Sequence, residues 1–324
     1  MADVSSTVAP GAGEMQGALD RALKEVLACP ACFSGLAVGD GDRSLECRSC
    51  RRSYPVEDGI PVLLESRGPA RQLDELQFRE GVAARHGSCG VDELLDVLSS
   101  YHCIPVMTRE AERFSVRFSP DRWIVDLGIG YGWHWMSRKA GPRILGVDMS
   151  MGNLKIARRL LRDTHDVVLV CADAARLPIR QRCIAGIWSV QVLQHLPDLA
   201  LRQAQEEMNR VLDDRFFLEM CNLNPAFLLR LAYRVAFRKL HRHGRAGEIE
   251  LNRLSAREWL EIWRPFRPGS TDVSVAYSEL FFHPDLRIRP SRYPLRLERY
   301  LAERAGRVAK LIARQVHVRV ASRV

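Results

Sequence analysis

The middle of the chain alternates between strand-like and helix-like segments, and this alternation restricts the fold more than any other feature. Short apolar runs rich in β-branched residues cover 124–127, 144–147, 167–170, 184–190 and 216–220. Segments of helical character lie between them at 133–139, 153–162 and 201–212. Strands that alternate with helices form parallel sheets with helices on both faces. The sequence therefore predicts an α/β fold with a mostly parallel sheet.

Two further runs near the C-terminus alternate between apolar and polar residues. They cover 271–277 and 315–320. Strict alternation is typical of a half-buried strand. We expect these runs to pair antiparallel at one edge of the sheet.

A glycine-rich loop follows the first apolar run and reads Asp126-Leu-Gly128-Ile-Gly130-Tyr-Gly132. In the dinucleotide-binding pattern GxGxxG, the third glycine would fall at position 133, which is Trp. In addition, Asp126 precedes the glycines, and a carboxylate there disfavours a pyrophosphate. A cationic ammonium group, such as the methionine end of S-adenosylmethionine (SAM), is favoured instead. The loop therefore predicts SAM as the ligand.

Acidic residues also follow the next two predicted strands. Asp148 ends the run 144–148, where an acid accepts hydrogen bonds from ribose hydroxyls. Asp173 follows the run 167–170, where a carboxylate accepts from an adenine amino group. Each acid alone is better explained as a helix cap or a solvated loop residue. Together with the glycine loop, they predict a nucleoside site at three successive strand ends.

The segments VDLGIGYG, GVDMS, ADAARLP and IAGIWSVQVLQHLPD resemble the class I SAM-dependent methyltransferases over residues 120–222. The resemblance leans to the type 11 subgroup, which acts on small molecules, quinones and natural products. It implies a Rossmann-like sheet, and it implies cofactor contacts from Asp126, Gly128, Gly130, Tyr131, Gly132, Asp148, Met149, Asp173, Ala174 and Ser189. The chain departs from the family at 213–215, where Asp-Asp-Arg replaces a Pro-Gly-Gly turn. That change affects the turn before the fifth strand and not the SAM pocket.

His195, just past the fourth predicted strand, is the candidate general base for a hydroxyl or protonated amine acceptor. The alternative is structural, with His195 bonded to Asp198 or to a backbone carbonyl and holding the loop. Tyr131, Trp133 and Trp135 have two interpretations as well, as residues that shape the pocket or as core residues on the helix after the loop.

Four of the nine cysteines form two CxxC pairs, Cys29/Cys32 and Cys47/Cys50, separated by 14 residues. Two such knuckles facing each other close a tetrahedral zinc site. Four thiolate ligands leave no position for water, so the zinc would be structural. Four unpaired thiols or two disulfides are the alternatives. The start of the chain has no basic segment followed by an apolar one, so we expect a cytoplasmic protein with reduced cysteines.

The stretch LACPAC…LECRSCRRSYPVEDGIPVLL, residues 27–64, resembles the zinc-ribbon family typified by the activator subunit of tRNA and translation-factor methyltransferases. That family is often fused to, or partnered with, methyltransferase domains. We therefore expect a tail or helix over 1–26, a zinc ribbon over 27–66, a helical linker and cap over 67–121, and a methyltransferase domain over 122–324.

Positive charge is concentrated in the last third of the chain. Residues 221–324 carry 21 Lys and Arg against 9 Asp and Glu, a net charge of +12, so the first 220 residues carry −3 of the total of +9. Residues 227–242 read as a basic amphipathic helix with Arg at 230, 234, 238 and 242. The asymmetry indicates an anionic partner, although charge runs often only cover solvated faces.

These observations favour a SAM-dependent methyltransferase that modifies a small-molecule or natural-product acceptor at oxygen or nitrogen, with SAM and a structural zinc ion. The fourth predicted strand does not end in the Asn/Asp-Pro-Pro-aromatic motif that exocyclic-amine methyltransferases of adenine and glutamine use. The chain also has no Pro-Cys dipeptide, which disfavours pyrimidine C5 methylation by a cysteine nucleophile. Methylation of rRNA or tRNA through the basic third is one alternative. A catalytically silent module that binds SAM or activates a partner is another. The chain contains no run of about 18 apolar residues, so no transmembrane helix is predicted.

Overall fold

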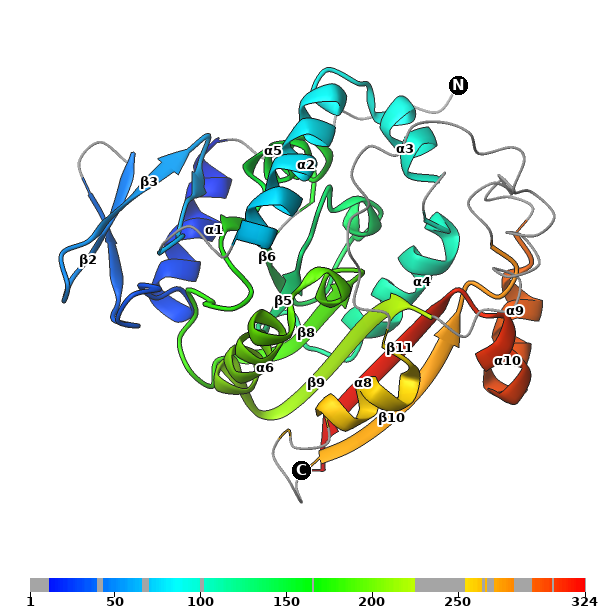
Figure 1. Cartoon of the computed structure of the whole chain (residues 1–324). Helices are drawn as coiled ribbons and strands as arrows, with labels where there is room; N and C mark the ends of the chain where they lie inside the picture. The colour runs from blue at the N-terminus through cyan, green and yellow to red at the C-terminus, as the bar shows by residue number, and fades with distance from the viewer. Residues whose placement is uncertain are drawn as a thin grey trace.

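A computed structural model describes residues 12–39, 43–65, 70–99, 102–164, 166–224, 254–263, 266, 271–282, 293–304 and 306–323. Within these residues the chain forms a large seven-stranded sheet and a small four-stranded sheet. Figure 1 shows the small sheet at one end of the large one, next to helix α1 (Ala12–Glu25). The predicted basic helix at 227–242 lies outside the described residues.

The large sheet has the strand order β10-β11-β9-β8-β5-β6-β7. Its strands are β5 (Trp123–Leu127), β6 (Arg143–Asp148), β7 (Val167–Cys171), β8 (Ile184–Val190), β9 (Leu212–Leu223), β10 (Thr271–Ser278) and β11 (Gln315–Ser322). The five strands from β5 to β9 pair in parallel, whereas β11 pairs antiparallel with both β9 and β10. The predicted mostly parallel sheet with antiparallel strands at one edge is confirmed.

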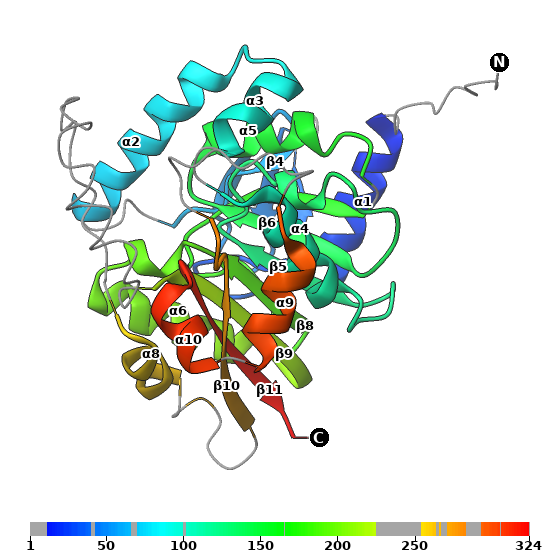
Figure 2. The same ribbon diagram turned by 90° about the vertical axis from the view of Figure 1, so that its right-hand side faces the viewer.

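Helices cover both faces of the sheet. One buried face is shared with α1, α6 (Asp198–Val211) and α8 (Ala256–Trp263), which contribute Leu23, Met208 and Trp259. The other is shared with α3 (Val91–Ser99), α4 (Ile104–Ser115) and α5 (Met151–Leu160). Helix α2 (Ala70–His86) packs on α5, and α9 (Leu295–Arg304) and α10 (Gly306–Ile312) lie beside β10 (Figure 2). This is the layered arrangement expected of a parallel sheet.

The predicted helix at 133–139 is wrong. Only a single 3₁₀ turn, η2 (Trp133–Trp135), follows the glycine loop. The side chains of His134 and Trp135 turn inward to a buried carboxylate on β5, and Gly141, at φ 137°, belongs to the link into β6. The tryptophans are core residues, because Trp133 and Trp135 are both buried.

The small sheet is the cysteine-rich ribbon, formed by β1 (Leu36–Val38), β2 (Ser44–Cys47), β3 (Ser53–Glu57) and β4 (Ile60–Pro61), all antiparallel. It is attached to the free edge of the large sheet. Val62 pairs in parallel with Cys171 of β7, and Leu27 pairs antiparallel with Ile179. The ribbon is therefore packed directly against the edge strand and the loop that follows it. Among the described helices, none has the length and apolar character needed to cross a membrane.

Candidate cofactor and metal sites

The three predicted cofactor acids lie at one edge of the large sheet. Asp126 is near the end of β5 and Asp148 ends β6, which pairs with β5 in parallel. Asp173 comes two residues after β7, which pairs in parallel with β6. The carboxyl ends of neighbouring parallel strands open to the same side, where ligands of such sheets bind. The structure thus brings together the strand ends that the sequence singled out.

The glycine loop has the shape of a cradle with one open position. Gly128, Gly130 and Gly132 all have positive φ, at 75°, 55° and 67°. A Cβ atom on Gly128 would lie 2.0 Å from Val192, and one on Gly132 would lie 2.6 Å from Leu161, so both positions are closed by protein. A Cβ atom on Gly130 would meet nothing within 4 Å. The backbone at Gly130 therefore faces open space beside the strand-end acids, which fits a bound cofactor there.

Asp126 is fully buried, with 1% of its surface exposed. Its Oδ2 accepts hydrogen bonds from Trp135 Nε1 at 2.6 Å and is 2.8 Å from His134 Nε2. Both donors come from the 3₁₀ turn just after the glycine loop, so the acid closes that loop onto β5. Sequence reasoning missed His134, because the inward turn that aims its ring at Asp126 was read as a helix.

Asp148 links β6 to the glycine loop and to the start of α5. Its Oδ2 accepts from the Gly130 N–H at 2.9 Å, and its Oδ1 accepts from the Ser150 N–H at 2.8 Å. Burial raises the pKa of the Asp148 carboxyl, and the two backbone N–H groups oppose that rise. The carboxylate thus fixes the one glycine of this loop that faces open space, and it lies where a ribose is expected.

Asp173 sits in a tight turn. Its Oδ1 accepts from the Ala175 N–H at 2.8 Å, and its carbonyl accepts from the Arg176 N–H at 3.0 Å. Burial raises the pKa of the Asp173 carboxyl, and the hydrogen bond from the Ala175 N–H offsets only part of that rise. The next residue, Ala174, is buried. The side chain is therefore held by its own turn, at the end of the strand that borders the ribbon.

Two other predicted contacts, Met149 and Ser189, lie beside these acids. The carbonyl of Met149 accepts from the Cys171 thiol at 3.4 Å. The buried Ser189 hydroxyl on β8 donates to the Leu127 carbonyl at 3.0 Å. Ser189 therefore braces the strand that leads into the glycine loop, a role that the sequence did not suggest.

Helix α2 lies over the same edge and supplies contacts that the sequence did not reveal. Arg79 Nη2 is 3.3 Å from His195 Nε2, and His86 Nδ1 is 2.8 Å from the Tyr131 hydroxyl. Glu80 accepts from the Gly152 N–H at 3.2 Å. An arginine can only donate, so His195 Nε2 accepts in this arrangement. His195 is thus held by a distant cap helix.

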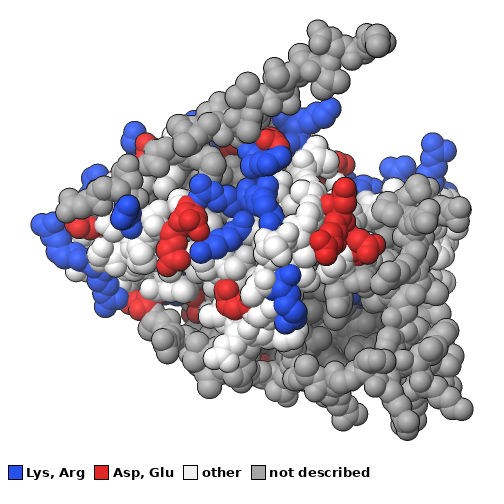
Figure 3. All heavy atoms as spheres, turned by 90° about the horizontal axis from the view of Figure 1, so that it is seen from above, with Lys and Arg blue, Asp and Glu red and all other residues white. Residues whose placement is uncertain are grey.

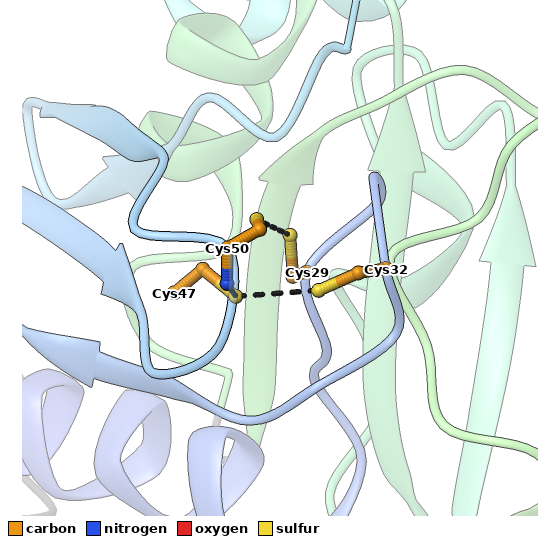
Figure 4. A group of neighbouring side chains, drawn as sticks. All are labelled: Cys29, Cys32, Cys47 and Cys50. Atoms are coloured by element: carbon orange, nitrogen blue, oxygen red, sulfur yellow. Dashed lines mark hydrogen bonds between the residues drawn. The ribbon is translucent and has the colours of Figure 1, made fainter.

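The four cysteines of the two CxxC pairs converge, as Figure 4 shows. Their sulfur atoms all lie within 4.8 Å of one another. Cys29 Sγ is 3.7 Å from Cys50 Sγ, and Cys32 Sγ is 3.4 Å from Cys47 Sγ. Zinc–sulfur bonds of about 2.3 Å in a tetrahedron place sulfur atoms about 3.8 Å apart. The cluster therefore fits a tetrahedral ion, and no disulfide joins these residues.

The thiol pKa values point the same way. Hydrogen bonds from Ser34 lower the pKa of Cys32 to about 6. For Cys50, the Arg52 N–H lowers the pKa, but burial and the neighbouring thiols outweigh it and raise the pKa to about 12. One thiolate thus forms readily and opposes the ionisation of its neighbour. Four thiolates this close require a cation between them.

One cavity, of about 430 Å³, lies away from this chemistry. It is bordered by α1, the Gly59 turn of the ribbon and the end of α5, and Arg158 and Arg162 line it. None of the three strand-end acids borders this cavity. We therefore base the cofactor site on the glycine loop and the acids and not on the cavity.

Comparisons with known proteins find two separate segments of the chain that resemble known families. A model of the methyltransferase domain matches residues 124–215, and a model of Trm112p-like proteins matches residues 20–59. The UPF0434 protein of Nitrosococcus oceani is 48% identical over 56 residues, which are 17% of this chain and 92% of the relative. The UPF0434 protein of Aeromonas salmonicida is 47% identical over 57 residues, 18% of this chain and 89% of the relative.

Solved structures show lower similarity. A chain in the complex of the Haloferax volcanii Trm112 methyltransferase activator is 17% identical with a TM-score of 0.44, and the match covers 67% of this chain and 87% of that one. A SAM-dependent methyltransferase of Thermotoga maritima is 18% identical with a TM-score of 0.46, covering 69% of this chain and 91% of that one.

Proposed function

The chain is a SAM-dependent methyltransferase that belongs, through its N-terminal part, to the Trm112p-like family, and from this premise we propose that it methylates a small-molecule acceptor at oxygen or nitrogen. The observation that carries the cofactor part of the proposal is the open position at Gly130, bounded by the glycine loop and by Asp148. A neutral or anionic metabolite is the expected acceptor class.

The cofactor would be held by the residues that the strand ends bring together. Asp148 would accept from the ribose hydroxyls, Asp173 from the adenine amino group, and Asp126 would attract the ammonium group. The remaining contacts would come from Gly128, Gly130, Tyr131, Gly132, Met149, Ala174 and Ser189. Because Asp126 is buried and already bonded to His134 and Trp135, we expect its attraction to act through the field of its charge more than through a direct contact.

Bound SAM supplies a methyl group that is already activated as a sulfonium, so the protein's contribution is to position the acceptor and exclude water. We propose that His195 takes the proton from an acceptor hydroxyl or amine. Its Nε2 already accepts from Arg79, so this nitrogen carries the lone pair that a base needs. Arg79 would have to release this nitrogen before the acceptor could contact it, so a residue of α2 would control when His195 acts as a base.

We propose that Cys29, Cys32, Cys47 and Cys50 hold one structural zinc ion. The short sulfur–sulfur distances and the acidic thiol of Cys32 support this assignment. The site has no open ligand position, so the ion would stabilise the ribbon and take no part in methyl transfer. A thiolate site needs reduced cysteines, which supports a cytoplasmic location.

We prefer a small-molecule acceptor to RNA, and two described arginines of the basic C-terminal third support this choice because they are paired with acids. Arg314 bonds Glu279, and Arg319 bonds Glu219. On the face that Figure 3 shows, basic and acidic side chains are interspersed. Arginines neutralised inside the protein are not available to neutralise phosphates.

The test is transfer of a radiolabelled methyl group from SAM to a cellular extract that is then separated into metabolites and RNA. We expect label in the metabolite fraction and none from a Gly130→Val variant. Label that enters only the RNA fraction would refute the proposed acceptor class. Absence of label in both fractions, despite tight SAM binding, would favour a silent SAM-binding module.

A further inference from the structure

The loop after β7, residues 172–180, connects the proposed adenine contact to the ribbon. Arg176 lies three residues after Asp173, and its N–H donates to the Asp173 carbonyl at 3.0 Å. Its guanidinium reaches across to the first cysteine knuckle. Nε donates to the Pro30 carbonyl at 2.6 Å, and Nη2 donates to the Ala31 carbonyl at 3.0 Å.

Those two carbonyls belong to the residues between Cys29 and Cys32, the first pair of proposed zinc ligands. A knuckle of this kind keeps its backbone in one conformation when both cysteines are bound to the same ion. Arg176 therefore contacts the part of the ribbon whose shape depends most on the metal. A lysine could not make the same contact, because only the planar guanidinium presents two parallel donors.

Further contacts hold the guanidinium in place. It lies 4.3 Å from the centre of the Phe33 ring, just after the knuckle, and Nε is 3.4 Å from a carboxylate oxygen of Glu65. About 40% of the Arg176 side chain remains exposed. Solvent thus weakens the ion pair, so the two carbonyl bonds determine where the side chain lies.

We propose that Arg176 is a positioning residue that couples the four-cysteine site to the cofactor loop. Zinc in the ribbon fixes the knuckle carbonyls, Arg176 transmits their position to the turn at Asp173, and the turn is then ordered for adenine. This inference rests on the proposed function, because it assumes that the loop contacts SAM. Coupling between the affinities of two sites is reciprocal, so bound SAM also strengthens the binding of zinc by the same route.

Arg180 provides a matched control four residues further along. Its Nε donates to the Leu27 carbonyl at 3.1 Å and its Nη2 to the Leu23 carbonyl at 2.9 Å. It thus makes the same two kinds of bond to the N-terminal segment, but outside the cysteine knuckle. Arg180→Gln should weaken the packing of that segment without uncoupling the zinc from the turn at Asp173.

The experiment uses the full chain and S-adenosylhomocysteine, the demethylated product, as the probe. Its affinity is measured by calorimetry on zinc-loaded and on chelator-stripped protein, with circular dichroism as the check of folding. The affinity for zinc is then measured by equilibrium competition with a colorimetric chelator, with and without the probe. Coupled sites typically change each other's affinity by roughly 5- to 150-fold, and we expect about tenfold in both directions.

Two variants test whether the coupling between the two sites depends on Arg176. Zinc-loaded Arg176→Gln should bind the probe about tenfold more weakly, as the loss of two charge-assisted bonds predicts, and the probe should no longer strengthen its binding of zinc. Zinc-loaded Arg180→Gln should behave as the unmodified chain in both measurements. The comparison of probe affinities needs no metal removal, so it stands even where the stripped protein unfolds.

The outcomes separate the two proposals. Equal probe affinity in the zinc-loaded unmodified chain and in zinc-loaded Arg176→Gln would overturn the coupling and leave the methyltransferase assignment intact. A zinc-loaded chain that does not bind the probe at all would overturn the proposed function together with the coupling. An equal loss in Arg176→Gln and Arg180→Gln would show that general docking of the ribbon matters, and it would overturn the specific role of Arg176.

Discussion

At the scale of single residues, the glycine loop separates positions that serve packing from one that serves a ligand. All three glycines need positive φ, which side chains rarely adopt. Only Gly130 has open space where a Cβ atom would lie. Function and stability can therefore be tested on neighbouring positions of the same loop.

We expect Gly130→Ala to weaken S-adenosylhomocysteine binding by more than tenfold, because the new methyl group fills the open position. Its cost in stability should be about 1 kcal/mol, the backbone penalty alone. Gly132→Ala carries the same backbone penalty and adds a clash with Leu161 at 2.6 Å. Calorimetry and thermal unfolding measure both effects. If Gly130→Ala binds normally, the cofactor is not at this loop.

Asp148 is the acid whose removal should affect the cofactor most. We expect Asp148→Ala to weaken S-adenosylhomocysteine binding by about 1–3 kcal/mol, since two ribose hydroxyls lose an ionised acceptor and the Gly130 N–H loses its partner. Asp163→Ala is the control, because Asp163 is exposed and pairs with its neighbour Arg162 in solvent. Both variants are compared by calorimetry, and equal affinities would contradict the assignment of Asp148.

At the scale of elements, the sheet edge formed by β9, β10 and β11 carries a buried ionic cluster. His317 on β11 is 2.8 Å from Glu219 on β9 and 2.7 Å from the Ser278 hydroxyl on β10. Burial opposes the ionisation of Glu219. Its hydrogen bonds and charge interactions, first with His317 and second with Arg319, nevertheless lower its pKa to about 2. Burial likewise lowers the pKa of His317, yet Cys221 and Glu219 together hold it well above its ordinary value. Since burial also raises the pKa of the Cys221 thiol, we attribute the effect on His317 chiefly to Glu219.

This cluster predicts a definite dependence of stability on pH. Glu219 stabilises the fold above its ordinary pKa of 4.5, and the contribution is lost as the pH falls toward 2. His317 stabilises below its ordinary pKa of 6.5, and its contribution is lost as the pH rises through its raised value. The cluster therefore contributes most between these two ordinary values.

Between about pH 6 and pH 3, the change at Glu219 corresponds to roughly 2 kcal/mol. We expect the free energy of unfolding in urea to fall by that much more in the unmodified chain than in Glu219→Gln. Glu261→Gln serves as the control, because Glu261 lies on α8 and pairs with Arg257 in solvent. Parallel pH profiles for the unmodified chain and Glu219→Gln would rule out an ionised Glu219.

At the scale of the whole molecule, the asymmetry of charge raises the choice between RNA and a metabolite. The C-terminal third has a net charge of +12, but arginines of its described part, such as Arg314 and Arg319, are bonded to buried acids. These two arginines are therefore already held by carboxylates and are poorly placed to contact a polyanion.

We expect any RNA binding to be weak, with a shallow dependence on salt, because a pocket for a small metabolite pairs only one or two charges and the described Arg314 and Arg319 are already bonded to acids. Titration of total RNA at rising salt measures the slope. The double variant Arg230→Glu and Arg234→Glu, compared with Arg257→Glu, tests the predicted basic helix. Tight binding that falls steeply with salt and is abolished only by the double variant would replace the metabolite with RNA as the acceptor.

The sequence alone determined the features that depend on local pattern. The order of strands and helices followed from apolar periodicity, and all three acids at the strand ends were found because parallel strands point the same way. The spacing of the two CxxC motifs predicted that the four cysteines form one site. The helix expected at 133–139 failed because local pattern does not register the pull of a buried acid on His134 and Trp135.

Only the tertiary structure decided what joins distant parts of the chain. The bond between Arg79 and His195 spans 116 residues, and that between Arg176 and Pro30 spans 146. Such contacts depend on how α2 and the ribbon pack on the sheet, and no periodicity in either segment encodes the partner. The sequence thus predicted a cofactor site and a four-cysteine metal site separately, and the fold places the loop after β7 against the ribbon because the ribbon pairs with the free edge of β7.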